Sequence, residues 1–350
     1  MSSQAPSSPP RAVVTGGSGF VGRHLVEALA ASGHQVLSVD VGTPASAGAG
    51  AGSGRKNVSF LGADIRDPEA MTAACAGASV VFHNASLVHT KHNREEEVWS
   101  VNLGGTEAVI AACRAAGVPR LVYVSSASAV YEGRDIEHGD EALPYSSISQ
   151  APYADSKIAA EKVVLAANGG ALKACAIRPH VVFGPGDTRF LPAILARARA
   201  GRLNFAVGRG GKGAKLSDFT YVENLTDALL LAAEGLAPGG KAAGQAYFIT
   251  NGEPYPFFAF VADVLAQLGL PAMKGSVPYP VAYAAASVAE AWDTLKGGTL
   301  HAESGLTRFA VRYMCTHHYF SIEKARRELG YHPAVTLAEG IRKTTASLAG

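Results

Sequence analysis

Cysteine is scarce in this sequence, and long hydrophobic runs are missing. Its 350 residues include four cysteines, far apart and in no Cys-x-x-Cys pair. This spacing argues against a structural zinc site and predicts a reducing, cytoplasmic location. No run reaches the ~20 apolar residues of a membrane-spanning helix. The nearest, residues 277–295, contains two prolines and two acids and therefore predicts an amphipathic helix. That helix either packs on the rest of the chain or makes a peripheral membrane contact.

An excess of charge of either sign is also missing. Lys and Arg number 31 and Asp and Glu 29, a net charge of +2. No basic stripe carries interleaved aromatic residues, so nucleic acid is excluded as a partner. Residues 1–10 are rich in serine and proline without an apolar core, and they predict a disordered lead-in rather than a secretion signal. What the sequence has in quantity is apolar residues, 48% of the total, enough for a large core.

A glycine-rich turn, residues 15–22, stands between a short apolar run and a helical pattern. Strand, turn and helix in this order bind the pyrophosphate of a dinucleotide, because glycines allow the backbone to approach closely and the helix N-terminus offers N–H groups. The spacing Gly-x-x-Gly-x-x-Gly differs by one residue from the usual pattern. The residues expected to contact the cofactor here are Gly16, Ser18, Gly19, Phe20, Val21 and Gly22.

Strand and helix patterns alternate through the first half of the chain, which predicts an α/β fold with a parallel sheet covered on both faces. We expect a doubly wound sheet of the Rossmann type, binding NAD, over residues 11–180, to which 216–250 returns. Residues 181–215 and 251–345 predict a smaller C-terminal α/β domain that caps the sheet and binds substrate. Strands are expected at residues 12–14, 35–40, 58–61, 80–83, 120–125, 174–178 and 246–250. Helices are expected at residues 102–116, 191–200, 222–234, 256–268, 277–295 and 322–329, with a further start at Asp67.

An acid, Asp40, ends the second predicted strand, eighteen residues after the last glycine of the turn. A carboxylate there accepts hydrogen bonds from the ribose hydroxyls and repels a 2′-phosphate, so it predicts NAD rather than NADP. Asp64 and Ile65 follow the third strand, where the adenine should lie. The segment after the fourth strand is expected beside the diphosphate and ribose, through Asn84, Ala85 and Ser86.

Tyr153 and Lys157 are four residues apart, which places both side chains on one face of a helix. A tyrosine beside an ammonium group and an oxidised nicotinamide ring is expected to have its pKa lowered from ~10 toward the working range. We therefore expect Tyr153 to take the proton of a substrate hydroxyl, with Lys157 also holding the nicotinamide ribose. Ser126 is expected to fix the reacting oxygen, although Ser125 and Ser128 stand beside it.

With these motifs in this order, the chain resembles the extended short-chain dehydrogenases along nearly its whole length. The matching segments are residues 15–22, Asp64, residues 101–106 and 125–128, Tyr153 with Lys157, and residues 178–179 and 218–224. The resemblance implies catalysis by the serine, tyrosine and lysine above, and a homodimer. It completes the expected cofactor contacts with Asn102, Ser125, Tyr153, Lys157, Pro179, His180 and Val181.

Residues 125–133, 176–185, 248–254 and 325–333 are similar to the 3β-hydroxysteroid dehydrogenase family, and within it to NAD-dependent enzymes that decarboxylate 4α-carboxysterols. This resemblance implies oxidation of a 3β-hydroxyl on a sterol or steroid-like lipid, giving a 3-ketosterol with loss of carbon dioxide. Animal members carry a hydrophobic membrane segment near residues 277–300, which this chain lacks.

Three alternatives stay open. Reductases of 2-alkyl-3-oxoalkanoates in long-chain olefin biosynthesis share the residues 196–203, 236–239 and 306–309, although their usual cofactor is NADPH, which Asp40 disfavours. Sugar-nucleotide epimerases or dehydratases of the same superfamily typically carry an arginine where Ser217 stands here. A non-catalytic NAD-binding sensor would tend to lose the tyrosine or the lysine. In both the sterol hypothesis and the alkanoate hypothesis, the substrate carries a hydroxyl or ketone β to a carboxylate.

Such a carboxylate needs a cation or donor nearby. Position alone suggests four candidates: His89, Lys91, Arg94 and Arg189. His317 and His318 are adjacent and would point to opposite sides of a strand, so no metal site is expected.

Overall fold

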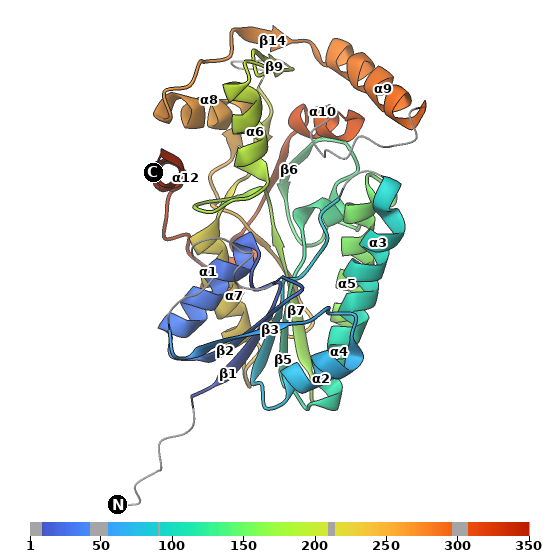
Figure 1. The fold of residues 1–350 in the computed structure, drawn as a ribbon, viewed down its shortest axis with the longest axis vertical. Helices are drawn as coiled ribbons and strands as arrows, with labels where there is room; N and C mark the ends of the chain where they lie inside the picture. The colour runs from blue at the N-terminus through green and yellow to red at the C-terminus, as the bar shows by residue number, and fades with distance from the viewer. Residues whose placement is uncertain (1–8, 43–54, 90–91, 209–213, 296–306, 350) are drawn as a thin grey trace, which may run out of the picture.

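The computed structural model describes residues 9–42, 55–89, 92–208, 214–295 and 307–349 (Figure 1). Most of the predicted lead-in, residues 1–8, lies outside this range, as does Lys91. Figure 1 shows two parts of the molecule. The lower part is a sheet covered by helices, and above it lies a smaller group of helices and short strands.

The main sheet has seven parallel strands in the order β12-β7-β5-β4-β1-β2-β3. The order reverses at β1, which pairs with β2 on one side and β4 on the other. In such sheets ligands bind at the carboxyl ends of the strands beside this switch point. The predicted fold class is therefore confirmed. The strands are β1 (Arg11–Thr15), β2 (Gln35–Asp40), β3 (Val58–Gly62), β4 (Val80–His83), β5 (Arg120–Val124), β7 (Lys173–Pro179) and β12 (Ala246–Ile249).

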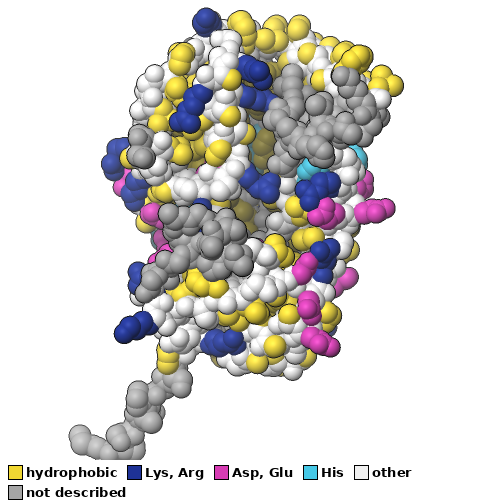
Figure 2. Space-filling model, in the orientation of Figure 1, with side chains coloured by type: hydrophobic (Ala, Val, Ile, Leu, Met, Phe, Trp, Pro, Cys, Tyr) yellow, Lys and Arg dark blue, Asp and Glu magenta, His cyan; other side chains and the backbone are white. Residues whose placement is uncertain are grey.

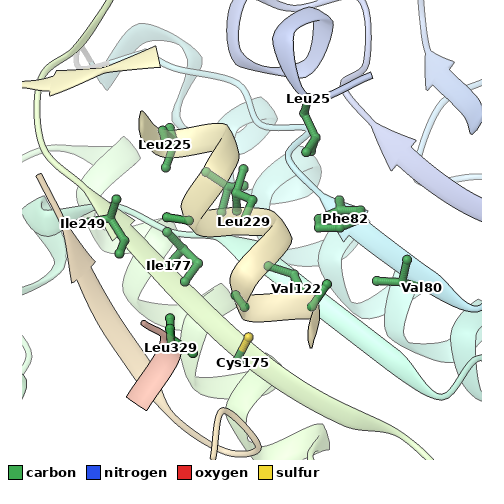
Figure 3. Close-up of a cluster of buried hydrophobic side chains, with 14 of the residues drawn as sticks. Leu25, Val80, Phe82, Val122, Cys175, Ile177, Leu225, Leu229, Ile249 and Leu329 are labelled. Carbon is green, nitrogen blue, oxygen red and sulfur yellow. The ribbon is translucent and has the colours of Figure 1, made fainter. Parts of the chain in front are cut away.

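Helices cover both faces of this sheet. One face carries α1 (Phe20–Ala31), α7 (Val222–Gly235) and α11 (Glu323–Leu329), and Figure 3 shows the leucines of these helices directed at the strands. The other face carries α2 (Pro68–Cys75), α4 (Gly105–Ala115) and α5 (Pro152–Ala167). Burial of apolar side chains on both faces explains why the strands read as continuous hydrophobic runs. The side chain of Asp67 caps α2 by accepting from the N–H groups of Glu69 and Ala70, as its position before a proline predicted.

The helix predicted over residues 102–116 begins earlier and is irregular. Helix α3 (Glu95–Trp99) runs into a π-helical turn, η3 (Ser100–Gly104), and then into α4. Three glutamates in the first turn of α3 suit the positive end of a helix. A π-helical turn widens the helix locally and is frequent near functional sites. Here the turn contains Asn102, whose contacts are described with the site.

The second half of the chain forms the smaller group of elements above the sheet. Its short strands make a four-stranded sheet in the order β13-β10-β15-β6 and two pairs, β8 with β11 and β9 with β14. These strands are β6 (Ile136–Gly139), β8 (Val182–Phe183), β9 (Phe205–Val207), β10 (Leu216–Ser217), β11 (Thr220–Tyr221), β13 (Tyr255–Pro256), β14 (Gly275–Val277) and β15 (His318–Phe320). The helices are α6 (Phe190–Arg199), α8 (Phe257–Gln267), α9 (Tyr279–Leu295), α10 (Arg308–Met314) and α12 (Leu337–Ala349). Short 3-10 turns, η2 and η4, lie at His92–Arg94 and Ala127–Val130.

Three parts of this upper group differ from the sequence expectation. Helices α10 and α12 were not predicted. Residues 216–217 join the four-stranded sheet, so the return to the main sheet comes through α7 and β12. The four-stranded sheet also takes β6 from the first half of the chain, which no local pattern indicates, because its partner β15 lies about 180 residues away in sequence.

Helix α9 occupies the segment that the sequence left between two interpretations. Its inward face packs Ala282 and Ala286 against Val311. Its outward face is apolar as well, with Val281, Val288 and Leu295 exposed. In Figure 2 the upper end of the molecule carries hydrophobic and basic side chains, while acidic ones lie lower on the sides. Among the described residues, each helix is too short or too polar to cross a bilayer.

Candidate active site

The glycine turn between β1 and α1 is packed tightly on the backbone that follows β4. Gly16 has a φ of 68°, and a Cβ added there would lie 2.7 Å from the Cα of Ala85. A Cβ on Gly22 would lie 2.0 Å from the carbonyl oxygen of Gly16. The turn therefore requires glycine at both positions. This packing brings the first N–H groups of α1 to the carboxyl edge of the sheet.

A cavity of about 690 Å³ opens at this edge, over the switch point between β1 and β4. Most of the predicted cofactor residues line it together: Gly16, Gly19, Phe20, Val21, Asp40, Asp64, Ile65, Asn84, Ala85, Ser86, Ser125, Tyr153, Lys157 and Pro179. A glycine cradle with no room for a Cβ, a helix N-terminus and a strand-end acid are the features that a dinucleotide requires. The residues present thus fit a nicotinamide dinucleotide.

Two acids predicted to hold the adenosine end lie in this cavity with defined partners. The Oδ2 atom of Asp40 accepts a hydrogen bond of 3.0 Å from the backbone N–H of Ser18, so the carboxylate is held against the glycine turn. Asp64 pairs with Arg66 at 2.5 Å. Hydrogen bonds from Arg66 lower the pKa of Asp64, which keeps that carboxyl charged. The predicted cofactor residue Ser18 is not among the residues that line the cavity, and its backbone N–H binds Asp40 instead.

The predicted pair on α5 reaches the cavity as expected. Pro152 begins the helix, and both Tyr153 and Lys157 line the cavity. The ammonium group of Lys157 donates to the carbonyl oxygen of Val124, at the end of β5, over 2.7 Å. It also lies 4.7 Å from the ring centroid of Tyr123. Burial lowers the pKa of Lys157 to about 7, although Glu161 opposes this shift.

The pKa of Tyr153 in the chain by itself depends on burial and on its neighbours. Burial raises it to about 12, while hydrogen bonding with Ser126 and the charge of Arg189 lower it. The ammonium of Lys157 donates to the carbonyl of Val124. In the chain by itself, desolvation of the phenol outweighs the groups that lower its pKa. The expected fall of the pKa concerns a tyrosine beside an oxidised nicotinamide ring and stays a prediction.

Among the three candidate serines, the contacts favour Ser126. Of the three, Ser126 is the one whose side chain lowers the pKa of Tyr153. It also accepts from the Oγ of Ser128 over 2.8 Å, so Ser128 supports it from behind. Ser125 is directed elsewhere, because its hydroxyl donates to the buried carboxylate of Glu161. That carboxylate also forms a buried ion pair with Arg178 at 2.6 Å.

Asn102 lies behind the cavity and does not line it. Its side-chain N–H groups donate to the carbonyl of Leu87 over 3.0 Å and to the hydroxyl of Ser156 over 2.9 Å. Its side-chain oxygen accepts from the N–H of Leu87 over 2.7 Å. Both side-chain N–H groups and the side-chain oxygen of Asn102 are therefore used in tying the loop after β4 to α5. It is a positioning residue for the cavity wall.

His180 and Val181 also lie behind the lining residue Pro179. The Nδ1 atom of His180 bonds to the carbonyl of Asp218 over 2.8 Å, which requires a proton on Nδ1. Its Nε2 atom then accepts from the hydroxyl of Tyr313 over 2.7 Å. Val181 has a φ of 37°, in the left-handed region that a β-branched residue rarely adopts. Gly22 likewise packs beneath the turn rather than facing the cavity.

A segment that the sequence analysis did not place at the cofactor site, residues 187–190, completes the cavity wall. Asp187 accepts from the N–H groups of Arg189 and Phe190 through one oxygen and from Leu191 through the other. An acid shortly before a helix is an N-terminal signal that could have predicted this placement. Arg66, Arg94 and Glu97 line the cavity as well, without such a signal.

The four candidate carboxylate partners separate clearly in space. Arg189 lines the cavity and lies close enough to Tyr153 to lower its pKa. Its Nη1 atom donates to the carbonyl of Val88 over 2.9 Å. Arg94 lines the cavity but forms a two-bond pair with Glu97 at 2.7 Å. His89 is buried, and its Nε2 atom forms a hydrogen bond of 2.6 Å with the side-chain oxygen of Asn93. Among the described candidates, Arg189 is thus the one that both lines the cavity and lowers the pKa of Tyr153.

The adjacent histidines have different partners. His317 lies near the surface, and the potential ligand atoms of Asp135, Glu137 and His317 are all within 4.8 Å of one another. The main-chain N–H of His317 donates to Asp135. His318 is buried, and its Nε2 atom bonds to the carbonyl of Tyr313. That the histidine pair holds no metal stays a prediction. Ser217, at the position where epimerases carry arginine, is buried and donates to the carbonyl of Asp218.

Comparisons with known proteins agree with this geometry. The sequence model of the 3-beta hydroxysteroid dehydrogenase/isomerase family matches residues 13–279. A 2-alkyl-3-oxoalkanoate reductase from Stenotrophomonas maltophilia is 40% identical, over 96% of this chain and 99% of that protein. The decarboxylating sterol-4-alpha-carboxylate 3-dehydrogenase of Mus musculus is 37% identical, over 96% of this chain and 90% of that protein.

Solved structures show the same fold. A UDP-glucose 4-epimerase from Thermus thermophilus, solved in complex with NAD, superposes with a TM-score of 0.70 over 97% of this chain and 99% of that one, at 24% identity. The family match spans more than half of the chain, and the two relatives cover nearly all of it. The chain belongs to the 3-beta hydroxysteroid dehydrogenase/isomerase family and is an NAD(P)-dependent oxidoreductase.

Proposed function

We propose that the chain uses NAD to oxidise the 3β-hydroxyl of a sterol or steroid-like lipid that carries a carboxylate on the neighbouring carbon, releasing a 3-ketosterol and carbon dioxide. The observation that carries the proposal is the grouping of Tyr153, Ser126 and Arg189. A phenol whose pKa a neighbouring serine side chain lowers can exchange a proton with an alcohol. A guanidinium that lines the same cavity as the phenol suits a carboxylate on the neighbouring carbon.

The preference for NAD rests on Asp40. Its carboxylate lines the cavity and is held by the N–H of Ser18, so it cannot turn away without losing that bond. A fixed negative charge favours ribose hydroxyls over a 2′-phosphate. Relatives named for sterol 4-alpha-carboxylates, at 37% identity, support the substrate part of the proposal.

The bound nicotinamide would supply the acceptor for the hydride of carbon 3. The hydroxyl of Tyr153 takes the proton of the substrate alcohol, and Ser126 holds the reacting oxygen. Lys157 can contact the cofactor ribose and stabilise the phenolate, provided that its ammonium moves from the carbonyl of Val124. The pKa of about 12 in the chain alone makes this stabilisation necessary, because a neutral phenol is a poor base at neutral pH.

Loss of carbon dioxide needs little further catalysis. Oxidation leaves a ketone β to the carboxylate. The electron pair of the bond to the carboxylate moves toward the ketone oxygen as carbon dioxide leaves, and the resulting enolate takes up a proton. Arg189 would orient the carboxylate before this step.

A second candidate is the reduction of a 2-alkyl-3-oxoalkanoate. The observation that favours it is the 40% identity to a reductase of that name, over 99% of its length. The same residues would serve, with Tyr153 donating a proton to the ketone oxygen instead of removing one. The two candidates differ in direction, in cofactor and in the shape of the lipid.

One screen separates them. The purified chain is assayed at 340 nm with a 4α-carboxysterol, a plain 3β-hydroxysteroid and a 2-alkyl-3-hydroxy acid, each with NAD and with NADP. The proposal expects the 4α-carboxysterol with NAD to give the highest kcat/KM and to release carbon dioxide. A higher value for the 2-alkyl-3-hydroxy acid selects the second candidate. Binding of NAD without turnover of any substrate would favour the alternative of a non-catalytic NAD-binding sensor.

The proposal also includes a homodimer and a peripheral membrane contact. Sedimentation velocity tests the first and flotation with phospholipid vesicles the second. A monomer, or a chain that stays out of the vesicle fraction, overturns the respective part without affecting the chemistry.

A further inference from the structure

A second cavity, which we name the cap cavity, lies in the upper part of the molecule and has a volume of about 750 Å³. Its lining comes from β9, α8, the start of α9 and the end of α10, in the upper part of Figure 1. Its size is comparable to that of the cofactor cavity. None of the predicted catalytic or cofactor residues lines it.

The lining of the cap cavity is apolar. Phe257, Phe258 and Met314 contribute large hydrophobic side chains, and Ala206 and Ala259 leave room between them. Lys215 is the one charged residue among the described residues that line it. Its ammonium is paired with Asp135 at 2.5 Å. A cavity of this size with a mainly apolar lining suits a flexible hydrocarbon.

An aromatic layer separates the two cavities. Phe190 lines the cofactor cavity and Phe257 lines the cap cavity, and their ring centroids are 5.9 Å apart. The rings meet at an angle of 62°. At this point the linings of the two cavities therefore touch through side chains.

Helix α10 makes a second connection. Tyr313 bonds to His180, directly after the cofactor-lining residue Pro179. Burial raises the pKa of Tyr313. The next residue, Met314, lines the cap cavity. The end of α10 thus places a residue bonded to His180 next to a residue that lines the cap cavity.

The outer surface beside the cap cavity is hydrophobic as well. Helix α9 begins with Tyr279, which lines the cavity, and continues with Val281 and Val288 exposed to solvent by 58% and 71%. An apolar ligand arriving at this end of the molecule would meet apolar surface before it enters.

We infer that the cap cavity holds a hydrocarbon chain of the substrate while its oxidised carbon lies at Tyr153. The inference rests on the proposed function for the position of the reacting carbon, and it applies to the side chain of a sterol and to an alkyl chain of a 2-alkyl-3-hydroxy acid alike. It makes the cap cavity, rather than the catalytic residues, the part that selects substrates by chain length.

The test uses a series of 2-alkyl-3-hydroxy acids with alkyl chains from butyl to dodecyl, compared in the wild type and in two matched variants. Ala259→Phe places a ring in the cap cavity. Ala266→Phe makes the same change on the exposed side of the same helix, α8, and serves as the control. In the wild type, kcat/KM should rise by roughly twofold to fourfold for each methylene until the cavity is filled.

Ala259→Phe should abolish this rise while leaving the butyl substrate within about twofold of the wild type, and Ala266→Phe should keep the whole series. A second measurement does not need turnover. Binding of 11-(dansylamino)undecanoic acid, followed by dansyl fluorescence, should be retained in Ala266→Phe and lost in Ala259→Phe. If Ala259→Phe does not fold, Ala206→Leu on β9 replaces it.

The outcomes separate the two proposals. Turnover of the series without a dependence on chain length, together with unchanged dansyl binding in Ala259→Phe, overturns the inference and leaves the proposed function standing. Dansyl binding that Ala259→Phe removes, without turnover of any acid or sterol, supports the cap cavity and overturns the proposed function.

Discussion

The two cavities of this molecule are similar in volume, about 690 and 750 Å³, and opposite in chemistry. The cofactor cavity is bounded by a glycine turn and by charged side chains from four separate segments, such as Asp40, Arg66, Arg94 and Arg189. The cap cavity is bounded by aromatic and aliphatic side chains, with one paired lysine. The volumes alone do not indicate which ligand each cavity binds. The lining of the first suits a charged nucleotide and that of the second suits hydrocarbon, and Tyr153 lines the first.

The largest expected effect comes from removing the hydroxyl of Tyr153. Tyr153→Phe deletes the hydroxyl that exchanges the proton and should lower kcat by about 10²–10⁴-fold or more. The affinity for NAD should change little, because the phenyl ring still fills the same wall. Rates are followed at 340 nm and affinity by quenching of protein fluorescence. Full turnover in this variant would remove the tyrosine from the mechanism.

A change in the glycine turn should break the cofactor cavity and leave the cap cavity intact. Gly16→Ala forces a left-handed residue and drives a Cβ to 2.7 Å from the backbone of Ala85, at a cost of about 1–3 kcal/mol. We expect a lower Tm and weaker NAD binding, with dansyl fatty acid binding unchanged.

The matched control is Gly62→Ala, at the end of β3, where an added Cβ meets no atom within 4 Å. It should leave NAD binding as in the wild type. Equal losses in both variants would mean that the effect is a general one of alanine for glycine and that the turn has no special geometry.

A smaller change sharpens the electrostatic side of the comparison. Asp40→Asn keeps an oxygen that can accept from the N–H of Ser18 and removes the charge that opposes a 2′-phosphate. The repulsion between two unit charges about 4 Å apart is ~1 kcal/mol in water and ~4 kcal/mol at an effective dielectric constant of 20. The ratio of kcat/KM for NAD over NADP should therefore fall by roughly tenfold. An unchanged ratio would place the cofactor preference elsewhere.

The smallest effect is one of stability and pH. Burial depresses the pKa of Lys157 to about 7 from an ordinary value of ~10.5, so the unfolded chain binds more protons between these two pH values. The free energy of unfolding should then rise with pH across this window in the wild type, relative to Lys157→Met. Urea denaturation at pH 7 and pH 9.5 measures the difference. A gap between the two proteins that does not depend on pH would contradict a buried lysine of lowered pKa.

The nucleotide half could be predicted from the sequence because its determinants are local. Strands β2 and β4 match their predicted bounds, Asp67 caps α2, and Tyr153 and Lys157 share one face of α5. Each depends on the spacing of a few neighbouring residues, and spacing is what a sequence displays.

The remainder depends on contacts between distant segments. The role of Asn102 depends on Leu87 and Ser156, and that of His180 on Tyr313, more than 130 residues away. The raised pKa of Tyr153 is a consequence of burial, which no motif reports. The aromatic layer between the cavities joins Phe190 to Phe257, two residues without any local signal of proximity.

The most direct test of the central claim, that one substrate spans the reacting centre and the cap cavity, is a crystal structure of the chain with NAD and a long-chain 2-alkyl-3-oxo acid. The account predicts the ketone oxygen within hydrogen-bonding distance of Tyr153 and Ser126, and the alkyl chain passing Phe190 and Phe257 into the space beside Met314. A chain that leaves the site into solvent, with the cap cavity empty of ligand, would contradict it.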